Sequence, residues 1–237
     1  MKSRVKIVSI AIILFGCTAQ QIQSITDAMG YEEGLSTDQV IDGLKEALVK
    51  GTNTGTQKVS QLDGYFKNPS IKIPFPPDVQ KVENTLRDVG LGSEVDRFVK
   101  TLNRGAEEAA KEAKPVFVNS IKQMTINDAW DILRGEDKEA ATNYLKRTTS
   151  DELRGKFSPI IKRALDNTNA TKYYADLINT YNKIPLVEKV NPDLENYATQ
   201  KAMDGLFFMI AEEEKKIRKD PAARTTELLK KVFKEQD

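Results

Sequence analysis

The chain has 237 residues, with no histidine and a single cysteine, Cys17, and its 36 basic and 35 acidic residues leave a formal net charge of +1. The absence of histidine excludes Ser-His-Asp and Cys-His catalysis, imidazole zinc sites and Glu-x-x-His di-iron motifs, and with no cysteine after Cys17 the rest of the chain has no thiolate metal ligand. Both signs of charge are intermixed along the sequence, so we expect no nucleic-acid-binding face, and no metal or cofactor is predicted.

The first 16 residues have the parts of an export signal. Lys2, Arg4 and Lys6 precede an uncharged, mostly apolar run at residues 7–16. A transmembrane helix needs about 20 apolar residues, and this run is about half that length. We therefore expect residues 1–16 to be removed as a signal peptide. Their loss takes three of the 36 basic residues, which leaves 33 against 35 acidic ones and a net charge of −2.

A lipid attachment motif ends this run. Leu14-Phe15-Gly16-Cys17 resembles the lipobox of bacterial lipoproteins, although Phe15 is bulkier than the small residue usual there. The resemblance implies cleavage before Cys17, diacylation of its thiol and acylation of the new amine, and two or more acyl chains anchor a protein stably. The residue after the cysteine is Thr18. An aspartate at this position would resemble an inner-membrane retention signal, so Thr18 favours the outer membrane, facing the periplasm. The alternative is an ordinary secretory signal with an incidental cysteine.

The rest of the chain divides into a tether and one domain. Residues 17–34 comprise the lipidated cysteine and a polar segment that, as a flexible coil, would hold the domain about 20 Å from its anchor. Residues 35–237 are enough for one well-buried domain.

Helical periodicity dominates residues 35–237, and no long alternating run suggests a sheet, so we predict an all-α, multi-helix domain. Ser36 and Gln39 form a capping box before the first helix, which we expect to weaken at residues 51–56. Further helices are expected near residues 78–89 (ending at Gly90), 94–112, 125–134 and 137–147.

Three later positions carry helix-start patterns. They are Thr149 with Glu152, Asn191-Pro192-Asp193 and Asp220-Pro221. The last predicted helix is amphipathic and presents Leu228, Leu229, Val232 and Phe233.

A proline-rich segment at residues 68–77 interrupts the helices. Three of its prolines fall within four residues, which forbids a helix and predicts an extended arm. The arm either lines a ligand or partner site, or is a packed connection with Ile71, Ile73 and Phe75 in the core. We favour packing, because buried apolar side chains usually serve it.

Residues 202–211 are apolar around nearly the whole circumference of a helix, which predicts a central, enclosed helix. Asp204 lies within this segment, and an unpaired buried charge would be very costly. Arg147, Arg104 or Lys201 would supply the countercharge. Downstream, Glu212 to Lys216 and Glu214 to Arg218 have the favourable i,i+4 spacing.

A candidate polar cluster follows from these residues. It comprises Asp204, Arg147, Arg104, Glu212 and Glu213. Asp204 with Glu212 or Glu213 would imitate the acid-base pair of a glycosidase, but a structural ion pair explains the same residues.

The C-terminal part resembles a known family. The segment Thr199–Arg218, followed by Asp220-Pro221 and Leu228–Phe233, closely resembles the end of the DUF4197 family. Other matching pieces are Gly43–Leu48, Ile71–Pro76, Asn103-Arg104, Tyr144–Thr149 and Phe157–Pro159. The family is bacterial, exported and without an assigned role, so the resemblance implies no catalytic residues.

Two functional classes remain. We favour a non-enzymatic envelope module, held at the membrane by its N-terminal lipid, that binds an envelope protein, a lipid or a small ligand. The alternative is a carboxylate-dependent hydrolase acting on envelope glycan, with Asp204 and Glu212 or Glu213 as acid and base. The enzyme requires these carboxylates to face one open cleft, whereas the binding module requires an apolar cavity or patch without them.

Overall fold

The computed structural model describes residues 36–88, 90–134, 137–167, 170–183, 185–186, 189, 193–224 and 230. The chain divides into two compact units, residues 1–36 and 37–237. The described part consists of helices and their connections and contains no strand, which confirms the all-α prediction. None of its helices combines the length and apolar character needed to cross a membrane. The predicted signal peptide, lipobox and tether lie outside the described residues.

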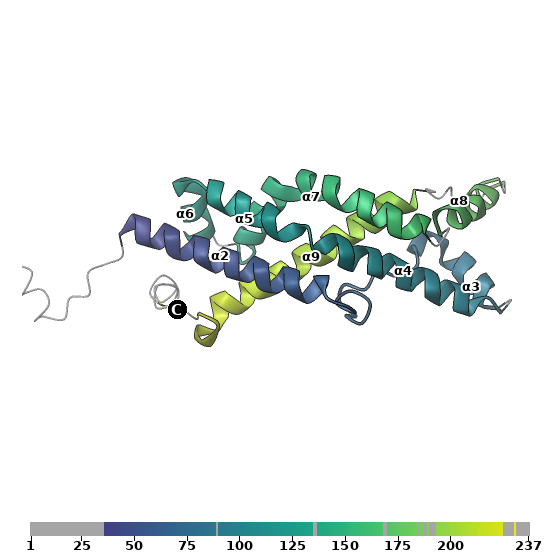
Figure 1. Ribbon diagram of the computed structural model, residues 1–237, viewed down its shortest axis with the longest axis horizontal. Coiled ribbons are helices and arrows are strands. Elements are labelled where there is room, and N and C mark those ends of the chain that lie inside the picture. The colour runs from purple at the N-terminus through teal and green to yellow at the C-terminus, as the bar shows by residue number, and fades with distance from the viewer. Residues whose placement is uncertain are drawn as a thin grey trace, which may run out of the picture. The chain divides into compact units, whose positions relative to one another are not determined.

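Eight α-helices and two short 3₁₀ turns make up the described part of the second unit (Figure 1). They are α2 (Thr37–Ser60), η1 (Pro77–Val79), α3 (Gln80–Asp88), α4 (Gly92–Ala110), α5 (Ala113–Gln123), α6 (Ile126–Arg134), α7 (Ala140–Asp166), α8 (Ala170–Tyr181), α9 (Leu194–Lys219) and η2 (Pro221–Ala223). Helices α5 and α6 lie beside α2 and the start of α7, whereas α3 and α8 lie near the opposite end of α7.

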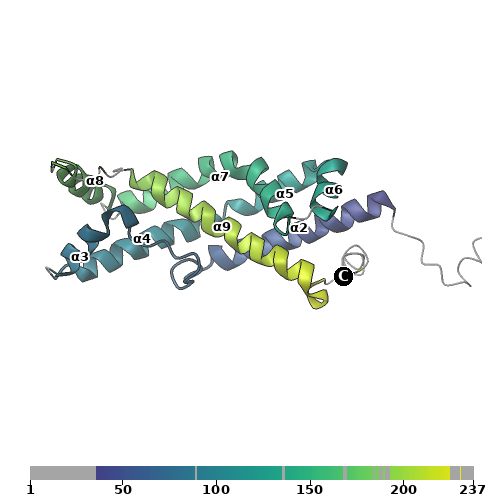
Figure 2. The same ribbon diagram turned by 180° about the vertical axis from the view of Figure 1, so that it is seen from behind.

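Helix α9 is the centre of the packing. It contacts α2, α4 and α7, and Figure 2 shows it crossing them diagonally. Met203, Leu206, Phe207 and Ile210 are buried in these contacts, which confirms the predicted central helix. One side of α9 stays open, however, and there Phe208 is 42% exposed.

Helix α2 runs unbroken through residues 51–56, so the expected weakening there is wrong. A Cβ added at Gly55 would lie 3.3 Å from Cγ1 of Ile210, and one at Gly51 would lie 3.5 Å from Cδ1 of Ile217. The 3.3 Å contact shows that Gly55 allows α2 to approach α9 closely, whereas an added Cβ at Gly51 would make an ordinary contact. The packing of α2 on α9 offsets the low helix propensity of both glycines.

Helix α7 is also continuous, so the predicted helix start at Thr149 is wrong. The Thr149 hydroxyl donates to the Leu145 carbonyl at 2.6 Å inside the helix and is not a cap. The start before α9 is confirmed at Asp193, whose carboxylate accepts from the Asn196 amide at 2.9 Å. Helices α5 and α8 were not predicted. Asn191, Pro192 and the last predicted helix lie outside the described residues.

The proline-rich segment packs into the core. Ile71, Ile73 and Phe75 are buried, as the packing alternative predicts. Asn103 of α4 binds both backbone groups of Ile73, since its Oδ1 accepts from the Ile73 amide and its Nδ2 donates to the Ile73 carbonyl, both at 2.8 Å. The segment therefore connects α2 to α3 as a fixed part of the fold.

Candidate functional site

Asp204 lies on the open side of α9, so its predicted burial is wrong. Its side chain is 53% exposed, accepts a hydrogen bond from Gln200 at 2.8 Å and lies 4.0 Å from the Lys201 ammonium. Residue 204 is one turn before Phe208, which is also exposed on this side of the helix. It needs no buried countercharge.

The two arginines of the predicted cluster have other partners. Arg104 binds Asp63 and Glu107, and the buried Glu107 carboxylate also accepts from the amides of Tyr65 and Phe66, both at 3.1 Å. Arg104 therefore holds the turn between α2 and the proline-rich segment.

Arg147 of α7 pairs with Asp128 of α6 at 3.1 Å. This ion pair lies where α6 packs on α7. Among the described residues, no hydrogen bond or ion pair joins Asp204 to either arginine of the cluster.

The two glutamates of the cluster are also separately paired. Glu212 is exposed and binds Lys215, not the Lys216 that the i,i+4 spacing predicted. Glu213 is buried and pairs with Lys58 of α2. The structure thus gives the five predicted residues separate partners and shows no shared acid-base cleft among them.

Glu214 has a role that was not predicted from the sequence. Its side chain is only 7% exposed, and its Oε1 accepts from Nε and Nη2 of Arg218 at 3.0 and 2.8 Å, as the i,i+4 spacing predicted. Glu214 also follows Met203, Phe207 and Ile210 at alternating intervals of four and three residues, on the buried face of α9. That spacing is the sequence feature that predicts its burial.

Glu214 caps α7 from outside that helix. Its carboxylate accepts from the amides of Ala141 and Thr142 at 3.1 and 2.8 Å and from the Thr142 hydroxyl at 2.7 Å. These amides lie in the first turn of α7, which has no side-chain cap of its own at Glu139. A carboxylate there satisfies free donors and faces the positive end of the helix dipole.

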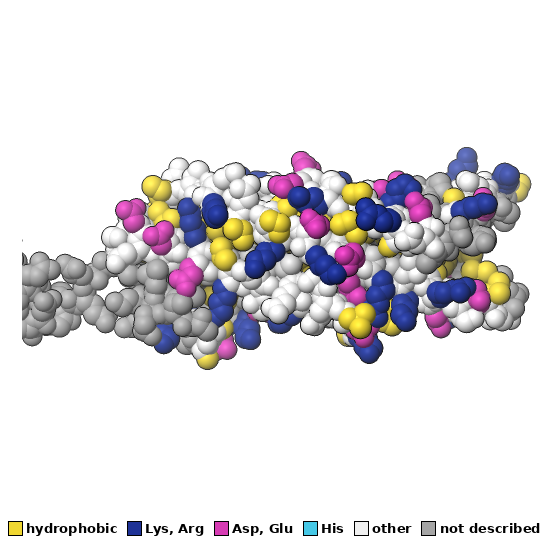
Figure 3. Space-filling model, viewed as in Figure 1, with side chains coloured by type: hydrophobic (Ala, Val, Ile, Leu, Met, Phe, Trp, Pro, Cys, Tyr) yellow, Lys and Arg dark blue, Asp and Glu magenta, His cyan; other side chains and the backbone are white. Residues whose placement is uncertain are grey.

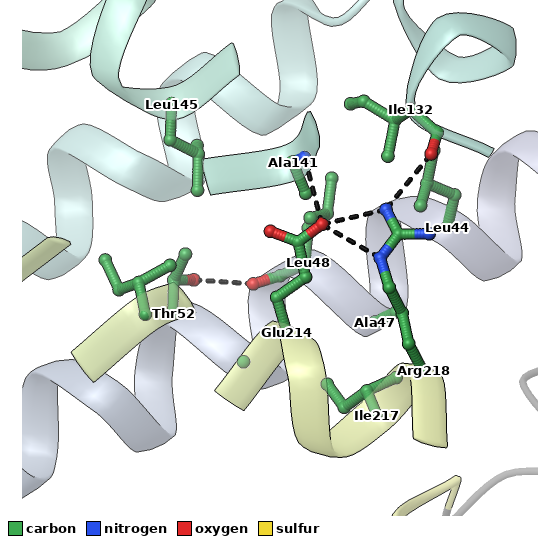
Figure 4. A pocket seen from close by; sticks show the side chains of 12 residues that line it. Leu44, Ala47, Leu48, Thr52, Ile132, Ala141, Leu145, Glu214, Ile217 and Arg218 are labelled. Carbon is green, nitrogen blue, oxygen red and sulfur yellow. Dashed lines mark hydrogen bonds and ion pairs between the residues drawn. The ribbon is translucent and has the colours of Figure 1, made fainter. Parts of the chain in front are cut away.

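Arg218 extends the same contact to α6. Its Nη2 donates to the Ile132 carbonyl at 3.0 Å. The Glu214–Arg218 pair therefore joins the last turn of α6, the first turn of α7 and the end of α9 (Figure 4).

An apolar pocket lies beside this ion pair, between α2, α6, α7 and α9 (Figure 4). Its volume is about 30 Å³. The lining is mostly aliphatic and consists of Leu44, Ala47, Leu48, Gly51, Thr52, Ile132, Ala141, Leu145, Ile210, Glu214, Ile217 and Arg218. The Thr52 hydroxyl is satisfied by the Leu48 carbonyl at 2.7 Å, and Glu214 and Arg218 satisfy each other. The pocket thus offers apolar contact with one charged wall.

A polar cleft of about 210 Å³ lies where α5, α6 and α7 meet. Its lining consists of Val116, Asn119, Ser120, Gln123, Asp128, Tyr144, Arg147, Thr148, Thr149 and Glu152. The Tyr144 hydroxyl donates to the Ser120 carbonyl at 3.0 Å, so the floor is built from satisfied groups, and Arg147 is 68% exposed at its edge.

The surface carries both signs of charge. Figure 3 shows lysine and arginine side chains interspersed with aspartate and glutamate over the face formed by α2, α4, α5 and α7. Within the described ranges, no group of three or more histidine, cysteine, aspartate or glutamate side chains is arranged to hold a metal ion. A third concave site, of about 290 Å³, lies between α7 and the start of α9 and is lined by Arg154, Ser158, Asp193, Glu195, Asn196 and Thr199. The apolar pocket and the polar cleft of α5, α6 and α7 are both lined by α6 and α7, so these two sites form the candidate binding region.

Comparison with known proteins supports the family resemblance alone. A family model described as "Protein of unknown function (DUF4197)" matches residues 34–234. No curated protein and no solved structure matches the chain.

Proposed function

Because the chain belongs to the DUF4197 family, whose description assigns no function, we propose that it is a cell-envelope lipoprotein anchored through Cys17, with a non-enzymatic helical binding module. The anchor holds the domain at the outer membrane, facing the periplasm. The Leu14-Phe15-Gly16-Cys17 motif after a short apolar run supports the anchor.

The apolar pocket beside Glu214 and Arg218 is the observation that carries the binding role. Its aliphatic walls beside one paired charge suit an apolar ligand better than acid-base chemistry, and its volume of about 30 Å³ requires a wall to move before a ligand enters. Lys58 neutralises Glu213, and Arg218 neutralises Glu214. Asp204 is exposed, and none of its described contacts is with another acid. No observation therefore favours the glycan hydrolase.

Mass spectrometry of the native protein, gently extracted from membranes, tests both parts. We expect an N-terminal peptide that begins at acylated Cys17 and an intact-protein spectrum with a stoichiometric non-covalent ligand. The mature chain, residues 17–237, carrying C17S should stay out of the membrane fraction and bind the same ligand. An N-terminus that retains residues 1–16 or lacks acyl groups would overturn the anchor, and a ligand-free spectrum would overturn the binding module.

A further inference from the structure

We propose that α6 is a movable cover, and that the apolar pocket beneath it takes the alkyl chain of a single-chain anionic amphiphile whose head group replaces Asp128 at Arg147. The inference rests on the proposed binding function and names the chemical class of its ligand.

The pocket is too small for a ligand while α6 stays in place. Ligand pockets usually span about 300–1,000 Å³, whereas this one measures about 30 Å³. One wall must therefore move before an alkyl chain can enter.

Of the four walls, α6 is the least embedded. Helices α2, α7 and α9 each run for 24 residues or more, and α9 packs on both of the others. Helix α6 has nine residues, of which Ala129, Ile132 and Leu133 are buried. Since local opening favours elements with few buried apolar groups, α6 is the wall that can move at least cost.

An arginine holds each half of α6. Arg147 binds the Asp128 carboxylate at 3.1 Å, and Arg218 donates to the Ile132 carbonyl at 3.0 Å. Displacement of α6 breaks both contacts and leaves the Arg147 guanidinium at the edge of the polar cleft without its acid. An anionic head group would restore that charge pair.

Asp128 and Ile132 also connect the two concave sites. They lie four residues apart, on one face of α6, with Asp128 lining the polar cleft and Ile132 lining the apolar pocket. Without α6 between them, the two sites form an apolar recess with a polar mouth, in which Arg147 is the cation that loses its partner and Glu152 is a second acid of the lining. That arrangement matches an alkyl chain with an anionic head.

The lining favours an alkyl chain over a peptide. The pocket walls are aliphatic, and the polar groups among them, Thr52, Glu214 and Arg218, already have partners. A buried peptide backbone would lose its hydrogen bonds to water there without replacement, whereas an alkyl chain has none to lose.

Binding of laurate tests the proposal on the mature chain, residues 17–237, carrying C17S. The only tryptophan of the chain, Trp130, lies on α6, so its fluorescence reports movement of the cover. We expect saturable binding of one laurate with a change in Trp130 emission, and at least tenfold weaker binding of dodecyltrimethylammonium, which has the same chain length and the opposite charge.

Three variants separate the head-group and chain sites. R147Q should weaken laurate binding about tenfold, while K146Q, which removes a neighbouring charge outside the cleft, should not change it. G51A adds a methyl group to the pocket wall at ordinary contact distance from Ile217. It should block binding by at least tenfold while leaving the fold intact.

Several results would overturn the proposal. They are equal binding of both head groups, binding that G51A leaves unchanged, or binding without a change at Trp130. Absence of laurate binding in a protein that carries another ligand on extraction would overturn the amphiphile and keep the binding module. A ligand-free native protein with no laurate binding would overturn both.

Discussion

Close contacts at single residues fix the packing of the proline-rich segment on α9. Tyr65 is fully buried, and its hydroxyl donates to the Ala202 carbonyl at 2.6 Å. The ring lies directly over Gly205, where an added Cβ would come within 2.6 Å of Cε1 of Tyr65 and 3.1 Å of Cβ of Ile71. Position 205 therefore admits only glycine without rearrangement.

Substitution of Gly205 by alanine should destabilise the protein. The new methyl group forces the Tyr65 ring away from α9, and such overpacking costs about 1–3 kcal/mol. Urea unfolding followed by circular dichroism measures the change. The matched control is G155A on α7, where an added Cβ meets nothing within 4 Å. It should raise the free energy of unfolding by up to about 1 kcal/mol because alanine is the better helix former. An unchanged stability of G205A would contradict the close contact.

At the scale of elements, one buried side chain coordinates three helices. Glu214 caps α7 and binds the arginine that holds α6. The sequence predicts the Glu214–Arg218 ion pair but not the helices that it joins, because i,i+4 spacing carries no information on which neighbours cover a helix. The same limit explains why α2 was expected to weaken at residues 51–56. The glycines at residues 51 and 55 predict a weak helix until α9 is known to lie against them.

Substitution of Glu214 by glutamine should weaken the junction of α6, α7 and α9. The neutral amide leaves Arg218 without its counterion and caps α7 less well, and hydrogen bonds to charged groups contribute about 1.5–3 kcal/mol. We expect a loss of that size in the free energy of unfolding from urea titration. E212Q, two residues away in the same acidic run but exposed, should change stability by less than about 0.5 kcal/mol. Equal effects of the two variants would show that burial of Glu214 does not matter.

Acid should release α6 through Asp128. The hydrogen bond from the Thr125 hydroxyl, together with that from Arg147, lowers the pKa of Asp128 below its usual 3.8. Because the pKa of Asp128 is lower in the folded state than in the unfolded state, its ionised form stabilises the closed position of α6. This stabilisation is fully present above pH 3.8 and is lost as the pH falls through the folded-state pKa. Trp130 fluorescence should change over that window. In D128N the same change should be absent, and its persistence would assign it to another group.

At the scale of the whole molecule, the described helices form a well-buried centre and a less buried edge. Helix α9 packs against α2, α4 and α7, all of them predicted at least in part from periodicity and caps. Helices α5 and α8 escaped prediction. In α5, Pro115 lies two residues after the first helical residue, where a proline costs a helix no hydrogen bond. The two concave sites could not be predicted, because each is lined from three or more helices.

The difference between centre and edge predicts a hierarchy of hydrogen exchange. Amides in residues 202–211 of α9 should exchange slowest, because their opening requires α2, α4 and α7 to separate, which is close to global unfolding. Amides of α6 should exchange at least tenfold faster at neutral pH, through displacement of this helix alone. Native-state exchange read by mass spectrometry resolves the two segments, and α5 is the control, since it adjoins α6 and also packs on α2 and α7. If α6 exchanged as slowly as α9, it would be part of the rigid core, and the pocket beneath it would remain closed to an alkyl chain.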